Sequence, residues 1–134
     1  MTNASGTAAM LAVALLGLVQ ATAARAGEGD AARGERVFQR CYACHSVDPD
    51  ETAKLQGPSL FQVLGRPAAR VAGFEFSDAM KAKGAAGLIW TPEALDAFIA
   101  DPEAFVPGTL MALPPLRSEQ DRADLVAYLA RVGR

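Results

Sequence analysis

The sequence has few of the side chains that usually bind metals or perform catalysis. Its 134 residues include one histidine and two cysteines, and all three lie in the stretch CYACH, from Cys41 to His45. A zinc site would therefore have three such ligands and would need a carboxylate as the fourth. The formal net charge is −2 and the basic residues are spread singly. The clustered Lys and Arg that bind nucleic acid phosphates are missing, which argues against nucleic acid as a partner.

Strand-like alternation, internal repeats and heptads are also missing, so the sequence predicts an all-α fold with three to five short helices and long loops. Helix-start residues and apolar spacing predict the individual helices. They are expected at 31–41, 77–83, 91–100 and 118–132. Helices this few and short bury little apolar surface compared with the entropy lost in ordering the loops. A large apolar prosthetic group at the centre would make up the difference.

The N-terminal region contains the only long apolar run, residues 10–19, which is short for a membrane span. Ala24-Arg25-Ala26 then has the small-x-small pattern of a cleavage site. Residues 1–26 are predicted to be a signal peptide for export to the periplasm, with a retained anchor as the alternative, and residues 27–134 to form one domain. Residues 1–26 hold one of the 13 basic residues and none of the 15 acidic ones, so cleavage leaves a more acidic chain.

The order Cys-x-x-Cys-His is the attachment motif of c-type haem. Two thiols separated by two residues on a helical turn match the spacing of the two vinyl groups, and the next residue, His45, lies beneath the iron. A disulfide between Cys41 and Cys44 would close a very small loop and would give His45 no role. A thioredoxin-like redox pair would need a βαβ pattern, which this sequence lacks. The motif therefore favours one covalently bound haem c.

The second axial ligand of the iron must be something other than histidine, and methionine is the natural candidate. Without residues 1–26, the methionines are Met80 and Met111. Met80 lies in a predicted helix, where a core or surface role is the ordinary one. Met111 lies in VPGTLMALPP, where prolines and a glycine fix the chain on both sides. The loop chemistry favours Met111 and leaves Met80 as the alternative.

Nearly all of residues 27–134 resembles class I cytochrome c, in particular the group of bacterial cytochrome c2 and mitochondrial cytochrome c. The segments that carry the resemblance occur in the family's order: GDAARGERVFQRCYACHSV, QGPSLFQVLGR, AGFEFSDAMKAKG, IWTPEALDAFIADPEAFVPGTLM and DLVAYL. The resemblance implies the class I fold wrapped around one haem. It also implies that Gly34 and Phe38 pack on Leu125 and Tyr128.

The same resemblance assigns roles to individual residues. It implies haem thioethers on Cys41 and Cys44, and axial ligation by His45 and Met111. The Pro58 carbonyl would accept a hydrogen bond from the proximal imidazole, which fixes its tautomer. Arg66 and Trp90 would donate to a haem propionate; the alternative is a solvated charge and a core indole.

Some positions depart from the family pattern. Phe76 and Phe98 stand where mitochondrial relatives have tyrosines, and Leu110 replaces the lysine just before the ligand methionine. The ring of lysines that steers relatives onto acidic partners is largely missing. We therefore hypothesise a more apolar docking patch that includes Leu110, Leu113 and Pro114.

The resemblance and the motif together predict a monomeric electron carrier and no enzyme. It would take one electron from a donor and pass it to an acceptor, for example a cytochrome bc1-type complex, an oxidase or a reaction centre. Two alternatives stay open at this stage. One is a cytochrome subunit of a larger redox complex, and the other is a haem peroxidase or gas sensor with a labile methionine ligand.

Overall fold

The computed structural model describes Met1 and residues 28–134, so the predicted signal segment lies almost entirely outside the described residues. Five helices follow one another along the described chain: α1 (Ala31–Phe38), α2 (Asp78–Ala85), α3 (Pro92–Ala100), α4 (Pro102–Phe105) and α5 (Glu119–Val132). Residues 28–134 contain no strand, only an isolated bridge between Pro67 and Ile89. No helix within this part is both long and apolar enough to cross a membrane. The predicted all-α class is confirmed.

A capping side chain starts each helix. The side chains of the five N-cap residues accept a hydrogen bond from a backbone N–H of the first turn, and each such cap contributes about 1 kcal/mol. These N-caps are Asp30, Ser77, Thr91, Asp101 and Ser118. Proline follows the cap in α3 and α4, where its missing N–H costs no helical hydrogen bond. For this reason Asp101-Pro102, which ends α3, also starts the short helix α4.

Two helix ends differ from the sequence expectation. α1 ends at Phe38. The chain then forms a tighter turn, in which the Cys41 N–H donates to the carbonyl three residues earlier, that of Phe38, at 2.7 Å. α2 passes through Gly84 and ends at Ala85, beyond the expected end at residue 83. A Cβ at Gly84 would lie 2.4 Å from the Ala68 carbonyl oxygen, so this glycine lets a loop approach the helix closely.

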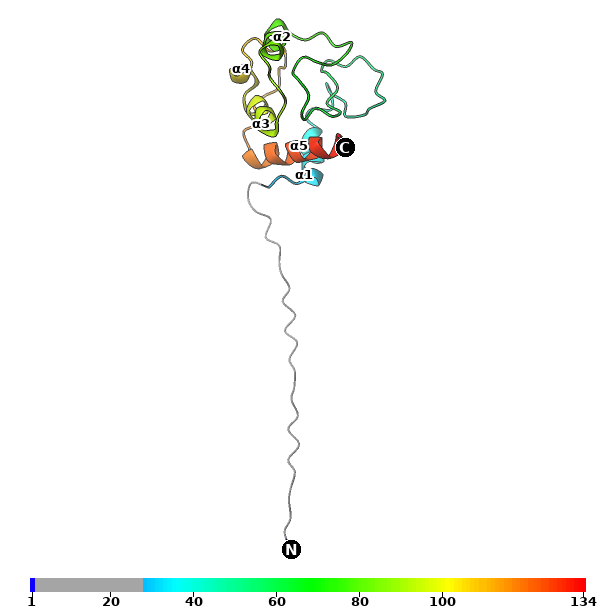
Figure 1. The fold of residues 1–134 in the computed structure, drawn as a ribbon, viewed down its shortest axis with the longest axis vertical. Helices are drawn as coiled ribbons and strands as arrows, with labels where there is room; N and C mark the ends of the chain where they lie inside the picture. The colour runs from blue at the N-terminus through cyan, green and yellow to red at the C-terminus, as the bar shows by residue number, and fades with distance from the viewer. Residues whose placement is uncertain (2–27) are drawn as a thin grey trace.

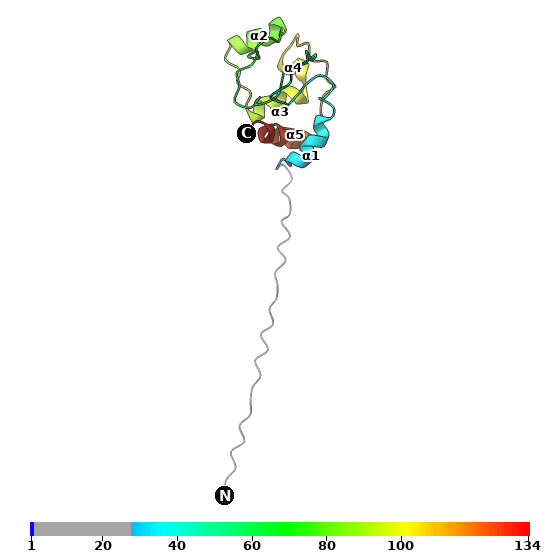
Figure 2. The same ribbon diagram turned by 90° about the vertical axis from the view of Figure 1, so that its right-hand side faces the viewer.

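The first and last helices cross in close contact at one end of the molecule, and α2 lies at the other end (Figures 1 and 2). A Cβ at Gly34 would lie 1.9 Å from the Asp124 carbonyl oxygen and 2.7 Å from the Tyr128 Cβ. Beside this contact the rings of Phe38 and Tyr128 have their centroids 5.4 Å apart. Leu125 belongs to the same buried cluster. Glycine is needed because the two backbones touch.

The side chain of Asp124 ties α5 to the start of α1. Its carboxylate accepts hydrogen bonds from the Asp30 N–H at 2.7 Å and from Arg33 Nε and Nη2 at 2.7 and 2.9 Å. Gln120 Nε2 donates to it at 2.9 Å. The Arg33 hydrogen bond is the main reason that the pKa of Asp124 falls from 3.8 to about 2; burial opposes this, and the bonds from Asp30 and Gln120 add to it. The carboxylate is therefore charged in the folded protein at all ordinary pH values.

Asp124 makes the stability of the fold depend on pH. Between pH 3.8 and about 2 the unfolded chain binds a proton that the folded chain does not, so the stabilisation is complete above pH 3.8 and is lost as the pH falls. Arg33 is 40% exposed, so solvent screening limits this contribution to about 1–2 kcal/mol. We expect Asp124→Asn to lose that amount at pH 7 and to show a flatter fall in stability below pH 4, measured by urea unfolding.

The control variant is Glu35→Gln. Glu35 pairs with Arg131 at 3.0 Å across the same two helices, and both side chains are more than half exposed. Such a pair is worth about 0–1 kcal/mol. An acid slope in Asp124→Asn equal to that of the wild type would show that Asp124 is not the titrating group.

Candidate functional site

The CYACH stretch forms a tight turn directly after α1. The N–H groups of Cys44 and His45 both donate to the Cys41 carbonyl, at 3.0 and 2.9 Å. Both cysteines are free thiols and partly buried, and Cys41 contacts the core cluster. The structure therefore contradicts the disulfide alternative. It presents two free thiols one turn apart, of which Cys41 contacts the core.

The electrostatic setting of Cys41 is not that of a redox-active thiol. Burial raises the pKa of the Cys41 thiol, and Cys44 raises it further, while the Arg40 charge partly opposes both. A reactive cysteine needs a lowered pKa, so the raised pKa of Cys41 favours its thiol form. Among residues 28–134, no group of three or more His, Cys, Asp or Glu side chains could hold a metal ion. The described residues thus give no support to the zinc and thioredoxin-like alternatives.

The His45 ring is fixed by the two residues Gly57 and Pro58. His45 Nδ1 lies 2.7 Å from the Pro58 carbonyl oxygen. A carbonyl can only accept, so Nδ1 carries the proton and Nε2 keeps its lone pair. Burial lowers the pKa of the imidazole, although the Pro58 hydrogen bond opposes the shift. The ring is therefore neutral at pH 7, and Nε2 is available to bind a metal ion.

Gly57 lies flat against the imidazole face. A Cβ at this position would be 2.3 Å from His45 Cε1 and 2.6–2.7 Å from the two ring nitrogens. The Gly57 N–H donates to the Cys44 carbonyl at 2.8 Å, which holds this loop on the motif. Sequence reasoning singled out Pro58 and missed Gly57, although the Gly-Pro pair is the signal that could have revealed it.

Arg66 and Trp90 are distant in sequence and adjacent in space. The backbone N–H of Trp90 donates to the Arg66 carbonyl at 3.0 Å, and the backbone N–H of Gly65 donates to the Trp90 carbonyl at 2.9 Å. Trp90 is 7% exposed, and its ring stacks near Phe98 and Phe105, with centroids 5.2 and 6.5 Å away.

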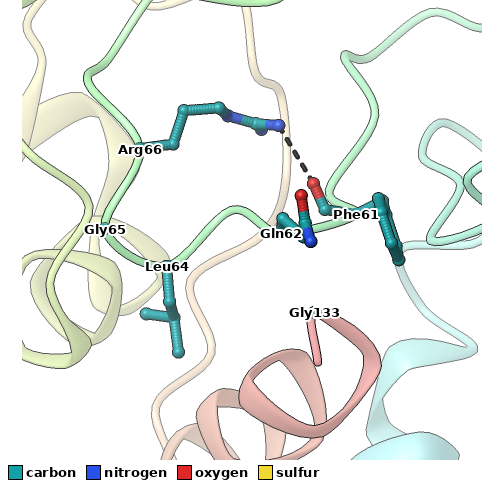
Figure 3. Close-up of a pocket in the computed structure, with 6 residues that line it drawn as sticks. All are labelled: Phe61, Gln62, Leu64, Gly65, Arg66 and Gly133. Carbon is teal, nitrogen blue, oxygen red and sulfur yellow. Dashed lines mark hydrogen bonds between the residues drawn. The ribbon is translucent and has the colours of Figure 1, made fainter.

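The Arg66 side chain donates only to backbone carbonyls. Its Nη1 bonds to the Phe61 oxygen at 3.1 Å and its Nη2 to the Ser59 oxygen at 2.7 Å. The side chain extends toward Phe61 beside a cavity of about 490 Å³ (Figure 3). Burial lowers the pKa of the guanidinium, and no carboxylate within residues 28–134 forms an ion pair with it. Arg66 is thus a half-buried cation without an anionic partner in the described chain.

Met111 lies in a loop that is anchored before and after it. Its N–H donates to Thr109 Oγ1 at 3.2 Å, and the side chain is partly buried against the core. Beyond it, the Leu116 N–H donates to the Ile99 carbonyl at 3.0 Å. Met80 lies in the first turn of α2 and is 7% exposed. Both methionines contact the same core cluster.

Arg122 anchors the far end of the Met111 loop, and sequence reasoning missed it. Its Nη1 donates to the carbonyls of Leu116 and Arg117 at 2.9 and 3.0 Å, while Nε pairs with Asp96 at 2.7 Å. It is 9% exposed. In the sequence it is one charged residue among several in a helix, so no local pattern distinguishes it.

The donor set fits a covalently attached haem. Two reduced thiols one turn apart can form thioethers, and a neutral imidazole offers Nε2 to the iron. The apolar core cluster suits a porphyrin, and Arg66 suits a propionate. The chemistry of these donors matches no other common cofactor as completely.

Comparisons with known proteins agree with this fit. The family model for cytochrome c matches residues 31–133. Cytochrome c2 of Rhodomicrobium vannielii is 44% identical over 123 residues, which are 91% of this chain and 91% of that protein. Cytochrome c 2.1 of Caenorhabditis briggsae is 42% identical over 102 residues, 75% of this chain and 87% of that one. The structure of cytochrome c2 from Rhodospirillum centenum superimposes with a TM-score of 0.73 at 40% identity, covering 79% of this chain and all of the other.

The contact between Gly57 and His45 can be tested by substitution. In Gly57→Ala the new methyl group must displace the imidazole and break its bond to Pro58, at a cost of about 2–3 kcal/mol. We expect less covalently attached haem per folded chain, measured by mass spectrometry, and a lower urea midpoint. Thr52→Ala, at an exposed position of the same loop, should stay close to wild type. Full haem attachment and unchanged stability in Gly57→Ala would contradict the argument.

Proposed function

Because the chain belongs to the cytochrome c family, we propose that it is a periplasmic one-electron carrier whose haem iron is bound by His45 and Met111. The protein carries a single, covalently attached haem c and is an electron carrier, not an enzyme. The bound haem supplies a one-electron couple between the ferrous and ferric states. The observation that carries the assignment of His45 is its hydrogen bond to Pro58 at 2.7 Å, which leaves Nε2 free to bind the iron.

The proposed attachment site uses the turn after α1. Cys41 and Cys44 would each form a thioether by adding S–H across a vinyl group, which consumes both thiols and needs no external oxidant. The turn geometry holds His45 against Gly57 and Pro58 at the same time. Pro58 makes the imidazole more basic and fixes its orientation, as outer-shell partners of metal-bound histidine do.

Met111 is the proposed second axial ligand. A thioether is a soft ligand that raises the reduction potential of haem iron. The bonds at Thr109 and Leu116 hold the loop on both sides of Met111. Met80 has a sufficient structural reason for its position, because it is buried within a capped helix. With His45 and Met111 both bound, the iron keeps no open position for a substrate.

Arg66 and Trp90 are proposed to donate to a haem propionate. Arg66 is half-buried, lies beside the Trp90 backbone, and has only carbonyl partners in the described chain. A buried carboxylate needs such donors. The charge of Arg66 would then be balanced by the cofactor.

The location and partners of the protein follow from the same proposal. Residues 1–26 would direct export and be removed, leaving a monomeric carrier in the periplasm. Its donor and acceptor would be redox proteins such as a cytochrome bc1-type complex, an oxidase or a reaction centre.

The ligand assignment can be tested by absorption spectroscopy of the ferric protein. The band to follow is the weak red absorption from methionine sulfur to iron. We expect Met111→Ala to lose this band and Met80→Ala to keep it. Met80→Ala should instead lower stability by about 2–4 kcal/mol, the cost of a buried cavity. A band that persists in Met111→Ala would refute the assignment.

The mode of docking can be tested through its salt dependence. Leu110 is 80% exposed. Two of the three lysines of the chain make contacts within it. Lys81 pairs with Glu75 and Asp78, and Lys83 Nζ lies 5.5 Å from the Phe105 ring centroid. Weak steering is therefore expected, and the rate constant for electron transfer with an isolated bc1-type complex should change less than about threefold between roughly 10 and 200 mM salt.

The matched pair of variants is Leu110→Ala and Ile89→Ala. Ile89 is a second exposed aliphatic side chain, at 39% exposure. Leu110→Ala should slow the reaction about three- to tenfold, and Ile89→Ala should leave it within twofold. A rate that falls tenfold or more with salt would instead indicate steering by charge.

A further inference from the structure

Glu103 makes a contact that the function described so far does not use. It lies in α4, and its Oε1 accepts a hydrogen bond from the Gly108 N–H at 3.0 Å. Gly108 precedes Met111 by three residues. The carboxylate therefore reaches out of its own helix and binds the backbone of the loop that carries the proposed ligand.

A second glutamate with the same local sequence behaves differently. Glu93 follows Thr91-Pro92 at the start of α3, as Glu103 follows Asp101-Pro102 at the start of α4. The Glu93 carboxylate turns back to its own backbone N–H and to Thr91, and these bonds lower its pKa. The forward contact of Glu103 is thus not a general consequence of the cap-Pro-Glu sequence, and Glu93 provides a matched control.

The turn that Glu103 binds has two possible orientations. The Thr109 N–H donates to the Val106 carbonyl at 2.9 Å, and Gly108 has φ +86°, which identifies a type II turn. In a type I turn the peptide between Pro107 and Gly108 is reversed, and the Gly108 N–H would point away from Glu103. The carboxylate therefore stabilises only the type II form.

Thr109 links this turn to Met111. Thr109, which closes the turn, uses its side-chain oxygen to accept the Met111 N–H at 3.2 Å. On the other side, the Ala79 Cβ of α2 lies 3.5 Å from the place where a Gly108 Cβ would be, so the turn rests on a helix. Without the Glu103 acceptor the turn would lose its bond to α4. Thr109 and the Met111 backbone that it binds would then be held less rigidly.

We propose that Glu103 is a positioning residue for Met111: its carboxylate holds the Gly108 peptide in the type II turn and thereby keeps the thioether in place for the iron. This inference rests on the proposed ligation by Met111. Loss of the carboxylate should leave the fold intact and make the methionine easier to displace.

The experiment is a titration of the ferric holoprotein with imidazole, which competes with the methionine sulfur and abolishes the red band. Glu103→Ala should bind imidazole about five- to tenfold more tightly than the wild type. Glu103→Gln keeps a carbonyl oxygen as acceptor and should recover part of the difference. Glu93→Ala should stay within twofold. As a second readout, NMR should show faster exchange of the Gly108 amide hydrogen in Glu103→Ala and not in Glu93→Ala.

The outcomes separate this inference from the ligand assignment. Loss of the band in Met111→Ala, together with wild-type imidazole binding in Glu103→Ala, would overturn the role of Glu103 alone. Equal effects of Glu103→Ala and Glu93→Ala would also overturn it, because the change would then reflect helix capping. A band that survives in Met111→Ala would overturn both proposals.

Discussion

The crossing of the first and last helices is the contact on which the rest of the structure depends. Gly34 lets the backbones of α1 and α5 touch, and the buried carboxylate of Asp124 joins α5 to the N-terminus of α1. This contact closes the two ends of the described chain onto each other. Because Cys41 follows α1 by one turn, the crossing also fixes where the thiols enter the core. A single methyl group at Gly34 would separate the helices and move the attachment site with them.

Backbone carbonyls of the long loops hold the side chains of the candidate site in place. Pro58 accepts from His45, and Ser59 and Phe61 accept from Arg66. The chain between α1 and α2 has no regular structure of its own, so its carbonyls are free to bind side chains. A loop of this kind is costly in entropy and needs a filled centre to stay ordered. The haem and its supporting loops would therefore stabilise each other. Side chains held in place before haem binding would suit an electron carrier, whose iron site should change little between oxidation states.

In this chain, charged side chains mainly hold neighbouring segments in position and are expected to contribute less to attracting partners. Asp124, Arg122 and Glu103 each bind backbone groups of a neighbouring segment. Several surface charges are also engaged within the chain, such as Lys81 with Glu75 and Asp78. Leu110, directly before the proposed ligand Met111, is an aliphatic side chain that is 80% exposed. Ion pairing within the chain thus leaves less charge for steering, which agrees with the proposed apolar docking onto redox partners.

Short-range patterns in the sequence determined the all-α class, the starts of every helix except α4, and the haem motif, because caps, prolines and the Cys-x-x-Cys-His spacing act over a few residues. The sequence also proposed the ligands: His45 is its one histidine, and the loop chemistry together with the family resemblance favoured Met111 over Met80. Both assignments stay predictions. Gly84 within α2, Gly57 against the imidazole, buried Arg122 and the forward reach of Glu103 were decided only by the tertiary structure. Each depends on which segment the folded chain brings beside it. The different contacts of Glu93 and Glu103 demonstrate this: one local sequence pattern has two outcomes, because only Glu103 has the Gly108 turn within reach.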